Sequence, residues 1–438
     1  MGMKVVKFGG TSLADAAQFR KVQQIMAADP ERRYIVPSAP GKRSPEDRKI
    51  TDLLYLCHAH VEQTIPFDDI FKIISQRFQQ ICSDLDLSLD LRPHLQEIER
   101  NIAAGVSADY VASRGEFLNG IIMADLLEFE FIDAAEVICF DEDGSFDSEK
   151  TQAVIGPRLA GCPRAVIPGF YGSLPDGNIK TFSRGGSDIS GAIVARGVAA
   201  SVYENWTDVS GFLMADPRIV PNPKPISTIT YRELRELAYM GATVLHEEAI
   251  FPVRQAGIPI NIKNTNHPEE PGTVIVQDAE PITLKGTITG IAGRKNFTVI
   301  ALEKALMNSE LGFGRKLLSV FEVNGISFEH LPSGIDTLSV VIADSQLDKK
   351  LDKVLSQIRQ QCQPDSIQVY PDMALIATVG RGMADTPGIA AKIFDALYRA
   401  KVNVRMIDQG SSEINIIVGI ENAHFEKAVQ AIYQAFEN

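Results

Sequence analysis

The last third of the chain contains an internal repeat, which limits the folds that this region can adopt. Six positions recur 76 residues later with the same apolar or basic character: Lys316, Leu317, Leu318, Phe321, Ile326 and Phe328 correspond to Lys392, Ile393, Phe394, Leu397, Val402 and Val404. Each copy predicts a strand, a glycine turn at Gly312 or Gly388, an amphipathic helix, two strands and a final helix near residues 347–360 or 424–436. A βαββαβ unit of this kind buries one helical face against an antiparallel sheet.

The preceding part of the chain alternates short apolar runs with longer helical patterns. β-Branched and aromatic residues predict strands at 4–8, 34–36, 137–140, 165–170 and 201–206. Helical periodicity predicts a helix over 14–28 and further helices through residues 51–127. This alternation is typical of a mostly parallel sheet covered by helices, so we expect an α/β fold.

Composition narrows the class of protein. The 438 residues, about two to four domains long, carry a formal net charge of −13 without a basic cluster, which argues against a nucleic acid or an anionic membrane as partner. The five cysteines form no CxxC pair, the N-terminus lacks the pattern of a secretion signal, and no segment has enough apolar length to span a bilayer. We therefore expect a soluble, cytoplasmic protein without a zinc ribbon.

A first pair of glycines follows the opening strand, in the segment Lys7-Phe8-Gly9-Gly10-Thr11-Ser12. Adjacent glycines let backbone N–H groups approach phosphate oxygens, and the start of the next helix adds partial positive charge. Lys7 would bring a full positive charge beside a transferred phosphoryl group. The P-loop pattern GxxxxGK[ST] is absent, so the segment is either a different phosphate-binding loop or a plain tight turn.

A second pair lies in Ser183-Arg184-Gly185-Gly186-Ser187-Asp188, before a helix predicted over 189–197. An arginine fork that suits a carboxylate, two glycines and an acidic side chain fall within six consecutive positions. The alternative is a surface loop in which Asp188 caps the helix. Two separate Gly-Gly loops, each flanked by a basic and a hydroxyl residue, favour the functional interpretation.

Two other regions give weaker signals. The segment Ser113-Arg114-Gly115-Glu116 is predicted to open a helix, where Glu116 is either a partner of the helix dipole or a buried carboxylate suited to a substrate ammonium group. The segments Thr207-Asp208-Val209-Ser210-Gly211 and Ala215-Asp216-Pro217-Arg218 are, taken alone, ordinary turn sequences.

Taken together, these motifs resemble those of aspartate kinases of the amino-acid kinase fold, and the repeated tail resembles their tandem ACT domains. The resemblance covers nearly the whole chain. It implies a three-layer α/β/α catalytic domain over residues 1–283, followed by ferredoxin-like ACT domains over 284–365 and 366–438. The first strand after residue 284 is assigned to either ACT unit.

The resemblance also implies a reaction, in which ATP with Mg²⁺ phosphorylates the side chain of L-aspartate to give L-4-phosphoaspartate and ADP. This reaction is the entry step to lysine, threonine and methionine. A carboxylate with an ordinary pKa of about 4 is already ionised near neutral pH, so no general base is required. The enzyme's task is to bring two anions into line and to spread their charge. Other acceptors within the fold are glutamate or a nucleoside monophosphate, and a different class would be a catalytically silent amino-acid sensor.

Site residues follow from the resemblance by position. Lys7 and Asp188 are implied at the transferred phosphoryl group, and Arg184 at a substrate carboxylate. The implied substrate site also contains Ser38, Thr51, Glu116, Phe170 and Ser187. The implied ATP site contains Lys7, Gly9, Gly10, Thr11, Ser12, Thr207, Asp208 and Arg218, and no side chain is assigned to the metal. Thr243 and Leu213 stand where the family usually has an ATP-binding lysine and a tyrosine.

For the tail, the resemblance implies an amino-acid effector pocket between paired ACT domains, with lysine as the first candidate and threonine as the second. The corresponding positions are Met307, Gly312, Phe313, Ser327, Phe328, Glu329 and Ser333. Glu329 would meet the second ammonium group of lysine, or it is an exposed glutamate at a strand edge. Paired ACT modules predict a homodimer or larger assembly, and the alternative for the whole tail is a dimerisation scaffold without a ligand.

Overall fold

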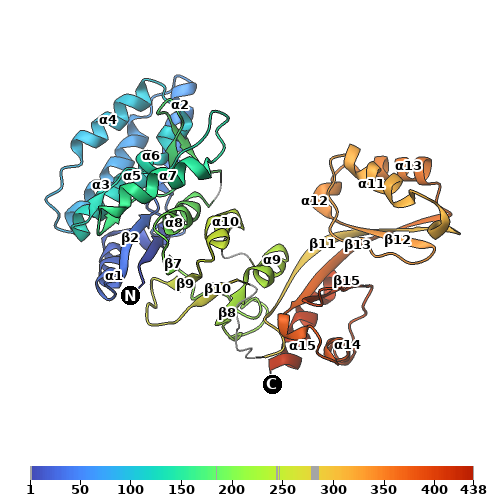
Figure 1. Ribbon diagram of the computed structural model, residues 1–438. Helices are drawn as coiled ribbons and strands as arrows, with labels where there is room; N and C mark the ends of the chain where they lie inside the picture. The colour runs from blue at the N-terminus through green and yellow to red at the C-terminus, as the bar shows by residue number, and fades with distance from the viewer. Residues whose placement is uncertain (1, 184, 243–244, 246, 278–285, 438) are drawn as a thin grey trace. The chain divides into compact units, whose positions relative to one another are not determined.

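The computed structural model describes residues 2–183, 185–242, 245, 247–277 and 286–437. The chain forms two compact units, each of which is described by itself (Figure 1). The first unit comprises Met1–Phe212, Ser227–Tyr231 and Val244–Pro281, and the second comprises Leu213–Ile226, Arg232–Thr243 and Ile282–Asn438. Within the described residues, we find no helix with the length and apolar character needed to cross a membrane.

The first unit is built on an eight-stranded sheet in the order β3-β4-β2-β1-β7-β9-β10-β8. All neighbouring strands run parallel except β9 and β10. The strands are β1 (Lys4–Phe8), β2 (Arg32–Pro37), β3 (Glu130–Phe131), β4 (Ala165–Val166), β7 (Val202–Thr207), β8 (Thr228–Thr230), β9 (Ile260–Asn264) and β10 (Thr273–Val276). The mostly parallel sheet predicted from the alternating pattern is confirmed.

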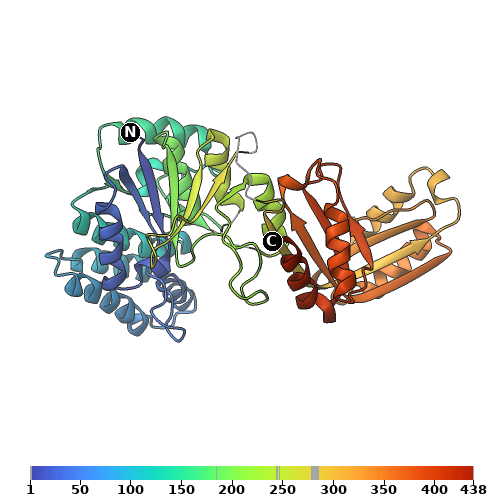
Figure 2. The ribbon, with the colours of Figure 1, turned by 90° about the horizontal axis from the view of Figure 1, so that it is seen from below.

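Helices cover both faces of this sheet, because successive side chains of a strand point to opposite faces. Val6 and Phe8 of β1 join a large apolar core with α1 (Ala16–Ala27), α2 (Ile50–Glu62), α3 (Asp68–Asp84), α4 (Arg92–Ala103) and α5 (Ala108–Leu127). The other face carries α8 (Gly186–Gly197), on which α7 (Ser148–Ala160) and α10 (Glu247–Ala256) pack. Figure 2 shows helices on both sides of the strands, so the three-layer α/β/α arrangement is confirmed.

One predicted strand of the first unit is wrong. Residues 137–140 do not form a strand, because the helical turn α6 (Ala134–Val137) occupies the start of this run. Cys139 and Phe140 then make isolated bridges, the first of them to the hairpin of β5 (Tyr171–Ser173) and β6 (Ile179–Thr181). The run is apolar because it is buried. A short buried segment has the same apolar sequence pattern whether it forms a strand or a turn of helix.

The second unit contains a five-stranded antiparallel sheet in the order β12-β11-β13-β15-β14. The strands are β11 (Gly290–Glu303), β12 (Thr337–Ala343), β13 (Ser366–Val379), β14 (Met406–Asp408) and β15 (Asn415–Glu421). Residues 290–295 of β11 pair with 374–379 of β13, whereas residues 299–303 pair with 366–370. Each of these two long strands therefore serves both repeats. The domain limits at 284 and 366 remain a prediction, and residue 284 lies outside the described residues.

Two apolar cores, one for each repeat, line this sheet. The first contains Ile300 of β11 and Leu317 of α11 (Phe313–Val323), and the second contains Ile291 of β11 and Ile393 of α14 (Ile389–Arg399). Gly312 and Gly388 precede these helices with φ angles of 81° and 91°, a left-handed conformation that favours glycine. The repeated helices are therefore confirmed residue for residue at the predicted offset.

The second unit also contains four further helices and three 3-10 turns among the described residues. They are α9 (Tyr231–Tyr239), α12 (Asp344–Leu347), α13 (Leu351–Cys362), α15 (Phe425–Glu437) and the 3-10 turns η2 (Met307–Ser309), η3 (Arg381–Met383) and η4 (Asn422–His424). The strand predicted after the first repeated helix is wrong, since His330 and Ser333 make only isolated bridges there. The equivalent segment of the second repeat does form a strand, β14.

We expect the Leu317→Ala and Ile393→Ala variants to lose about 2–5 kcal/mol of unfolding free energy, because each removes a fully buried side chain from one core. Urea unfolding of the whole protein measures the loss. The matched control is Ile73→Ala on α3, where the side chain is 53% exposed and the expected loss is below about 0.5 kcal/mol. Equal losses for the control and the core variants would contradict this assignment of the cores.

Candidate active site

The carboxyl ends of three adjacent strands bring the predicted motifs to one edge of the sheet. β1 lies between β2 and β7, and Phe8 is in register with Pro37 on one side and Trp206 on the other. Because the strands are parallel, the loops that follow them leave from the same edge. This is the usual location of ligand sites in open parallel sheets, beside the strand where the order reverses.

A buried ion pair joins the first and second glycine motifs. Lys7 Nζ lies 2.6 Å from Asp188 Oδ1, and the side chains are only 9% and 16% exposed. Asn205 of β7, in register with Lys7, donates its Nδ2–H to the same carboxylate oxygen at 2.8 Å. Tyr203 donates its hydroxyl proton to the backbone carbonyl of Asp188. The ammonium group is thus held on the α8 face of the sheet at its carboxyl edge.

The second glycine motif forms the N-terminus of α8. Gly185 is the N-cap with a φ of 60°, and Asp188 lies inside the first turn of the helix, so the alternative interpretation of Asp188 as the cap is wrong. A Cβ atom on Gly186 would lie 2.5 Å from the Phe170 ring, which shows how closely the two segments pack. Phe170 itself has a φ of 81°, unusual for a bulky residue. Arg184, the predicted carboxylate ligand, lies outside the described residues.

The loops after β1 and β2 are in direct contact. Gly41 donates its N–H to the carbonyl of Gly10 at 2.8 Å. A Cβ atom on Gly10 would lie 2.9 Å from the carbonyl oxygen of Ala39, so this position has no room for a side chain. Ser38 donates its N–H to the carbonyl of Phe8, and the Ser12 hydroxyl hydrogen-bonds Thr265. The predicted phosphate loop and amino-acid loop therefore form one packed surface.

Glu116 lies behind the second of these loops, in the middle of α5. Its position excludes the interpretation as a partner of the helix dipole, since α5 begins eight residues earlier, at Ala108. Burial raises the pKa of Glu116 to about 8, against partial compensation by the Ala39 N–H and by the charge of Arg114. Among the described residues, its Oε2 atom has no hydrogen-bond partner. A cationic ligand would supply the missing interaction.

The other predicted residues lie as follows. Thr51 is half-buried in the first turn of α2, next to Ile50, whose N–H reaches the carbonyl of Pro40. Ser187 packs against Gly169, where a Cβ atom would lie 2.7 Å from the serine side chain. Thr11 is exposed, and Gly9 donates its N–H to the carbonyl of Trp206 at the end of β7.

Two predicted ATP ligands lie at the carboxyl end of β7, and a third belongs to the second unit. Thr207 is the last residue of β7, and its hydroxyl donates to the Asp208 carboxylate. Arg218 and Leu213 belong to the second unit, where Arg218 is largely exposed and paired with Asp216 at 2.6 Å. Thr243 lies outside the described residues.

Sequence reasoning missed two polar residues that organise this edge of the sheet. Asn205 reaches Asp188 from β7, and Asn119 of α5 donates its amide N–H to the carbonyl of Ser38 at 2.7 Å. Both are buried, but only Asn119 interrupts an apolar segment, since Asn205 follows Glu204. A buried asparagine in an otherwise apolar helix is the signal that would have identified Asn119, because a buried amide requires hydrogen-bond partners.

The predicted effector residues lie in the first repeat of the second unit, but their environments differ. Met307 and Phe313 are buried in its apolar core, whereas Gly312, Ser327, Phe328 and Ser333 are exposed. Glu329 is half-buried and accepts a hydrogen bond from Tyr239, and burial together with this bond raises the pKa of Tyr239 to about 12.

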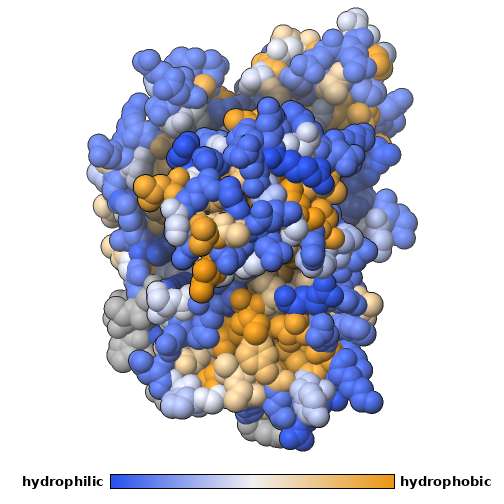
Figure 3. Space-filling model, turned by 90° about the vertical axis from the view of Figure 1, so that its right-hand side faces the viewer, coloured by the Kyte–Doolittle hydropathy of each residue, from blue (hydrophilic) through white to orange (hydrophobic). Residues whose placement is uncertain are grey.

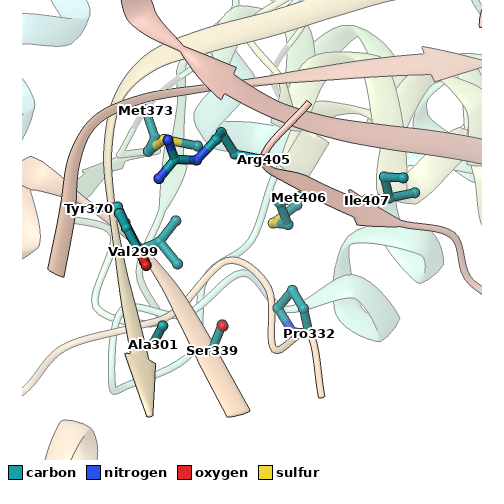
Figure 4. A pocket seen from close by; sticks show the side chains of 9 residues that line it. All are labelled: Val299, Ala301, Pro332, Ser339, Tyr370, Met373, Arg405, Met406 and Ile407. Atoms are coloured by element: carbon teal, nitrogen blue, oxygen red, sulfur yellow. The ribbon is translucent and has the colours of Figure 1, made fainter. Parts of the chain in front are cut away.

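A separate cavity of about 350 Å³ lies on the sheet of the second unit (Figure 4). None of the seven predicted effector residues lines it. Its walls come from β11, β12, β13 and β14, and the Arg405 guanidinium lies 4.8 Å from the centre of the Tyr370 ring at its edge.

We expect the stability of the protein to fall with rising pH through the titration of Glu116. The unfolded chain releases this proton near pH 4.5, whereas the folded protein keeps it until about pH 8. Between these values the folded state binds more protons, so this residue lowers the unfolding free energy by at most about 1.4 kcal/mol per pH unit. In urea unfolding from pH 5 to 9, Glu116→Gln should therefore gain stability relative to the unsubstituted protein until about pH 8. A difference independent of pH would contradict the assignment.

The sequence matches family models over both units. Residues 2–264 match the Amino acid kinase family, and residues 376–436 match the ACT domain. The structure is similar to that of Escherichia coli aspartokinase III in complex with aspartate and ADP, at 24% identity and a TM-score of 0.72 over both complete chains. At that identity, the similarity concerns the fold.

More similar relatives cover the entire chain. Aspartokinase 3 of Bacillus subtilis (strain 168) is 39% identical over 99% of this chain and 98% of its own length. The crystal structure of Clostridium acetobutylicum aspartate kinase is 62% identical, has a TM-score of 0.93 and covers 100% of both chains. These two relatives match 99% and 100% of the chain, and the protein therefore belongs to the amino acid kinase family, among its aspartokinases.

Proposed function

We propose that the protein transfers the terminal phosphoryl group of ATP to the side-chain carboxylate of L-aspartate, giving L-4-phosphoaspartate and ADP. The observation that carries this proposal is the placement of Lys7 and Glu116 at the two ends of the packed loops. A fixed ammonium group suits the phosphate, and a buried carboxylate whose Oε2 has no hydrogen-bond partner among the described residues suits the amino group of the acceptor. The product is an activated intermediate on the route to lysine, threonine and methionine.

The chain's own residues do this work by placing charges. Asp188 pairs with Lys7 at the edge of the sheet, and Asn205 donates a hydrogen bond to the same carboxylate. The Lys7 ammonium group would there offset the negative charge on the phosphoryl group during transfer. Glu116 would bind the substrate ammonium group, with Ser38, Thr51, Phe170, Ser187 and Arg184 around the rest of aspartate. Binding lowers the pKa of Glu116 from about 8, since a neighbouring cation favours the ionised form.

ATP would lie along the loop of Gly9, Gly10, Thr11 and Ser12, with Thr207 and Asp208 as further contacts. Among the described residues, no group of three His, Cys, Asp or Glu side chains is placed to hold a metal ion. Mg²⁺ often binds through substrate phosphates and water, so it would not need a cluster of protein ligands. When bound, Mg²⁺ would neutralise charge on the phosphates of the nucleotide.

We expect purified protein to release ADP from ATP and Mg²⁺ only when L-aspartate is added, with glutamate as the comparison acceptor. Lys7→Met should lower kcat by about 100- to 1,000-fold, because it removes a buried charge at the phosphoryl group. Lys150→Met is the matched control, since Lys150 is an exposed lysine on α7, and its kcat should stay within twofold.

Three results would decide against this function. Equal activity with glutamate would assign a different acceptor. Aspartate-independent ADP release, or none, would favour another reaction or a sensor without catalysis. The presence of both Lys7 and Asp188 in an intact ion pair supports the catalytic alternative.

We propose further that the second unit binds an amino-acid effector, lysine before threonine. The Clostridium acetobutylicum relative is described as an allosteric enzyme, which supports regulation of this chain. Apolar side chains gather in patches on a largely hydrophilic surface (Figure 3). Several exposed ones belong to the second unit, namely Leu306, Leu311, Val323, Phe328, Ile335, Tyr398 and Ile407. Such exposure supports assembly of a homodimer or larger oligomer through this unit.

Isothermal titration checks the effector proposal. We expect heat of binding with lysine, and a weakening of about tenfold or more in Glu329→Gln, because the glutamate would meet the second ammonium group of lysine. Glu322→Gln on α11 is the matched control, since Glu322 is an exposed glutamate outside the predicted pocket. Absence of heat with both lysine and threonine would remove the regulatory proposal.

A further inference from the structure

A buried arginine links the two loops of the candidate active site from behind. Arg77 lies on α3, and its side chain is only 4% exposed. Its Nη2 donates to the carbonyl of Ala14 at 2.7 Å and to the carbonyl of Gly41 at 2.9 Å. Ala14 directly follows the turn η1 (Gly10–Leu13), and Gly41 lies in the segment between β2 and α2. One guanidinium nitrogen therefore bridges both loops.

The other side of Arg77 is held by an acidic residue of the same loop region. Arg77 Nη1 lies 2.8 Å from Asp47 Oδ2, and Asp47 also accepts from the backbone and side chain of Arg43. These hydrogen bonds, from Arg43 first and then from Arg77, hold the pKa of Asp47 well below its usual range. Asp47 is thus ionised near neutral pH, and it orients the guanidinium toward the two carbonyls.

The loops that Arg77 bridges carry the two substrates in the proposed function. Gly41 contacts Gly10 directly, with N–H to carbonyl at 2.8 Å, and Ala39 contacts Glu116. A Cβ atom on Gly41 would lie 2.6 Å from the carbonyl carbon of Gly10, so the loops have no free space between them. A small shift of either loop therefore changes the separation of the phosphate side from the aspartate side.

We propose that Arg77 is a positioning residue, which sets the distance between the ATP-binding loop and the aspartate-binding loop. It touches neither substrate and acts through the carbonyls of Ala14 and Gly41. Each loop keeps its own ligand contacts without Arg77, so binding of the separate substrates persists. In-line transfer requires both substrates in register, and a displacement of about 1 Å is enough to lower turnover on the order of 100-fold.

The test is steady-state kinetics of Arg77→Met and Arg77→Lys in the full-length protein, measured by ADP release with saturating aspartate or ATP. We expect Arg77→Met to lower kcat by about 30- to 100-fold while both KM values stay within threefold. Lysine keeps the charge without the planar fork that reaches two carbonyls and a carboxylate, so Arg77→Lys should show an intermediate loss. It also keeps the test informative if the methionine variant does not fold.

Arg20→Met is the matched control. Arg20 also donates to a backbone carbonyl of α3, that of Asp84 at 2.7 Å, but its side chain is 56% exposed and far along the helix from Arg77. Its kcat should stay within twofold. Hydrogen exchange gives a readout that does not depend on activity. The Gly41 amide proton should exchange faster in both Arg77 variants, and its exchange rate should be unchanged in the Arg20 variant.

The inference depends on the proposed function, and the outcomes separate the two. If the unsubstituted protein shows no aspartate-dependent ADP release, the proposed function fails, and exchange of the Gly41 amide still tests the bridge. If the unsubstituted protein is active and a folded Arg77 variant keeps kcat within twofold, the positioning role is overturned. A fall in kcat/KM caused by a higher KM at unchanged kcat also overturns it, since Arg77 would then contribute to substrate binding.

Discussion

The parallel pairing of β1 with both β2 and β7 is the constraint on which the catalytic unit depends. Three parallel strands in register must end at one edge, and the chain segments after them must meet there. The alternation of side chains along β1 then determines on which face of the sheet each side chain lies. Val6 and Phe8 enter the apolar core under α1 to α5, while Lys7 emerges on the face of α8. A shift of one residue in register would bury the lysine among apolar side chains.

Buried charges are the second organising feature, and most of them are paired. Lys7 is matched by Asp188, Arg77 by Asp47, and Arg32 by Glu204, which also accepts from the Trp206 indole N–H. A buried charge without a partner is expensive, so these pairs are hydrogen-bonded as well. Glu116 differs from them, because its Oε2 has no partner among the described residues and burial keeps it protonated to about pH 8. That difference is what indicates a cationic ligand.

The regulatory unit depends on a different constraint, the sharing of two long strands. β11 and β13 each place one half in the first repeat and the other half in the second. Ile291 and Ile300, nine residues apart on β11, belong to separate cores. The two repeats are therefore joined by two continuous strands, although the register of their pairing shifts between Lys295 and Val299, where one repeat gives way to the other.

The sequence alone determined the fold class and the repeat. The 76-residue offset predicted a pair of equivalent helices, whose starts are marked by glycines with left-handed backbone, and the glycine motifs predicted the loops that lie at the sheet edge. Local patterns could not locate Glu116 in the middle of a helix, nor separate the turn at 134–140 from a strand. Only the tertiary structure decided that Asn205 completes the Lys7–Asp188 pair and that Arg77 joins two loops. These contacts link residues 17 to 63 positions apart, and a contact across that distance depends on how strands and helices pack, which no local pattern records.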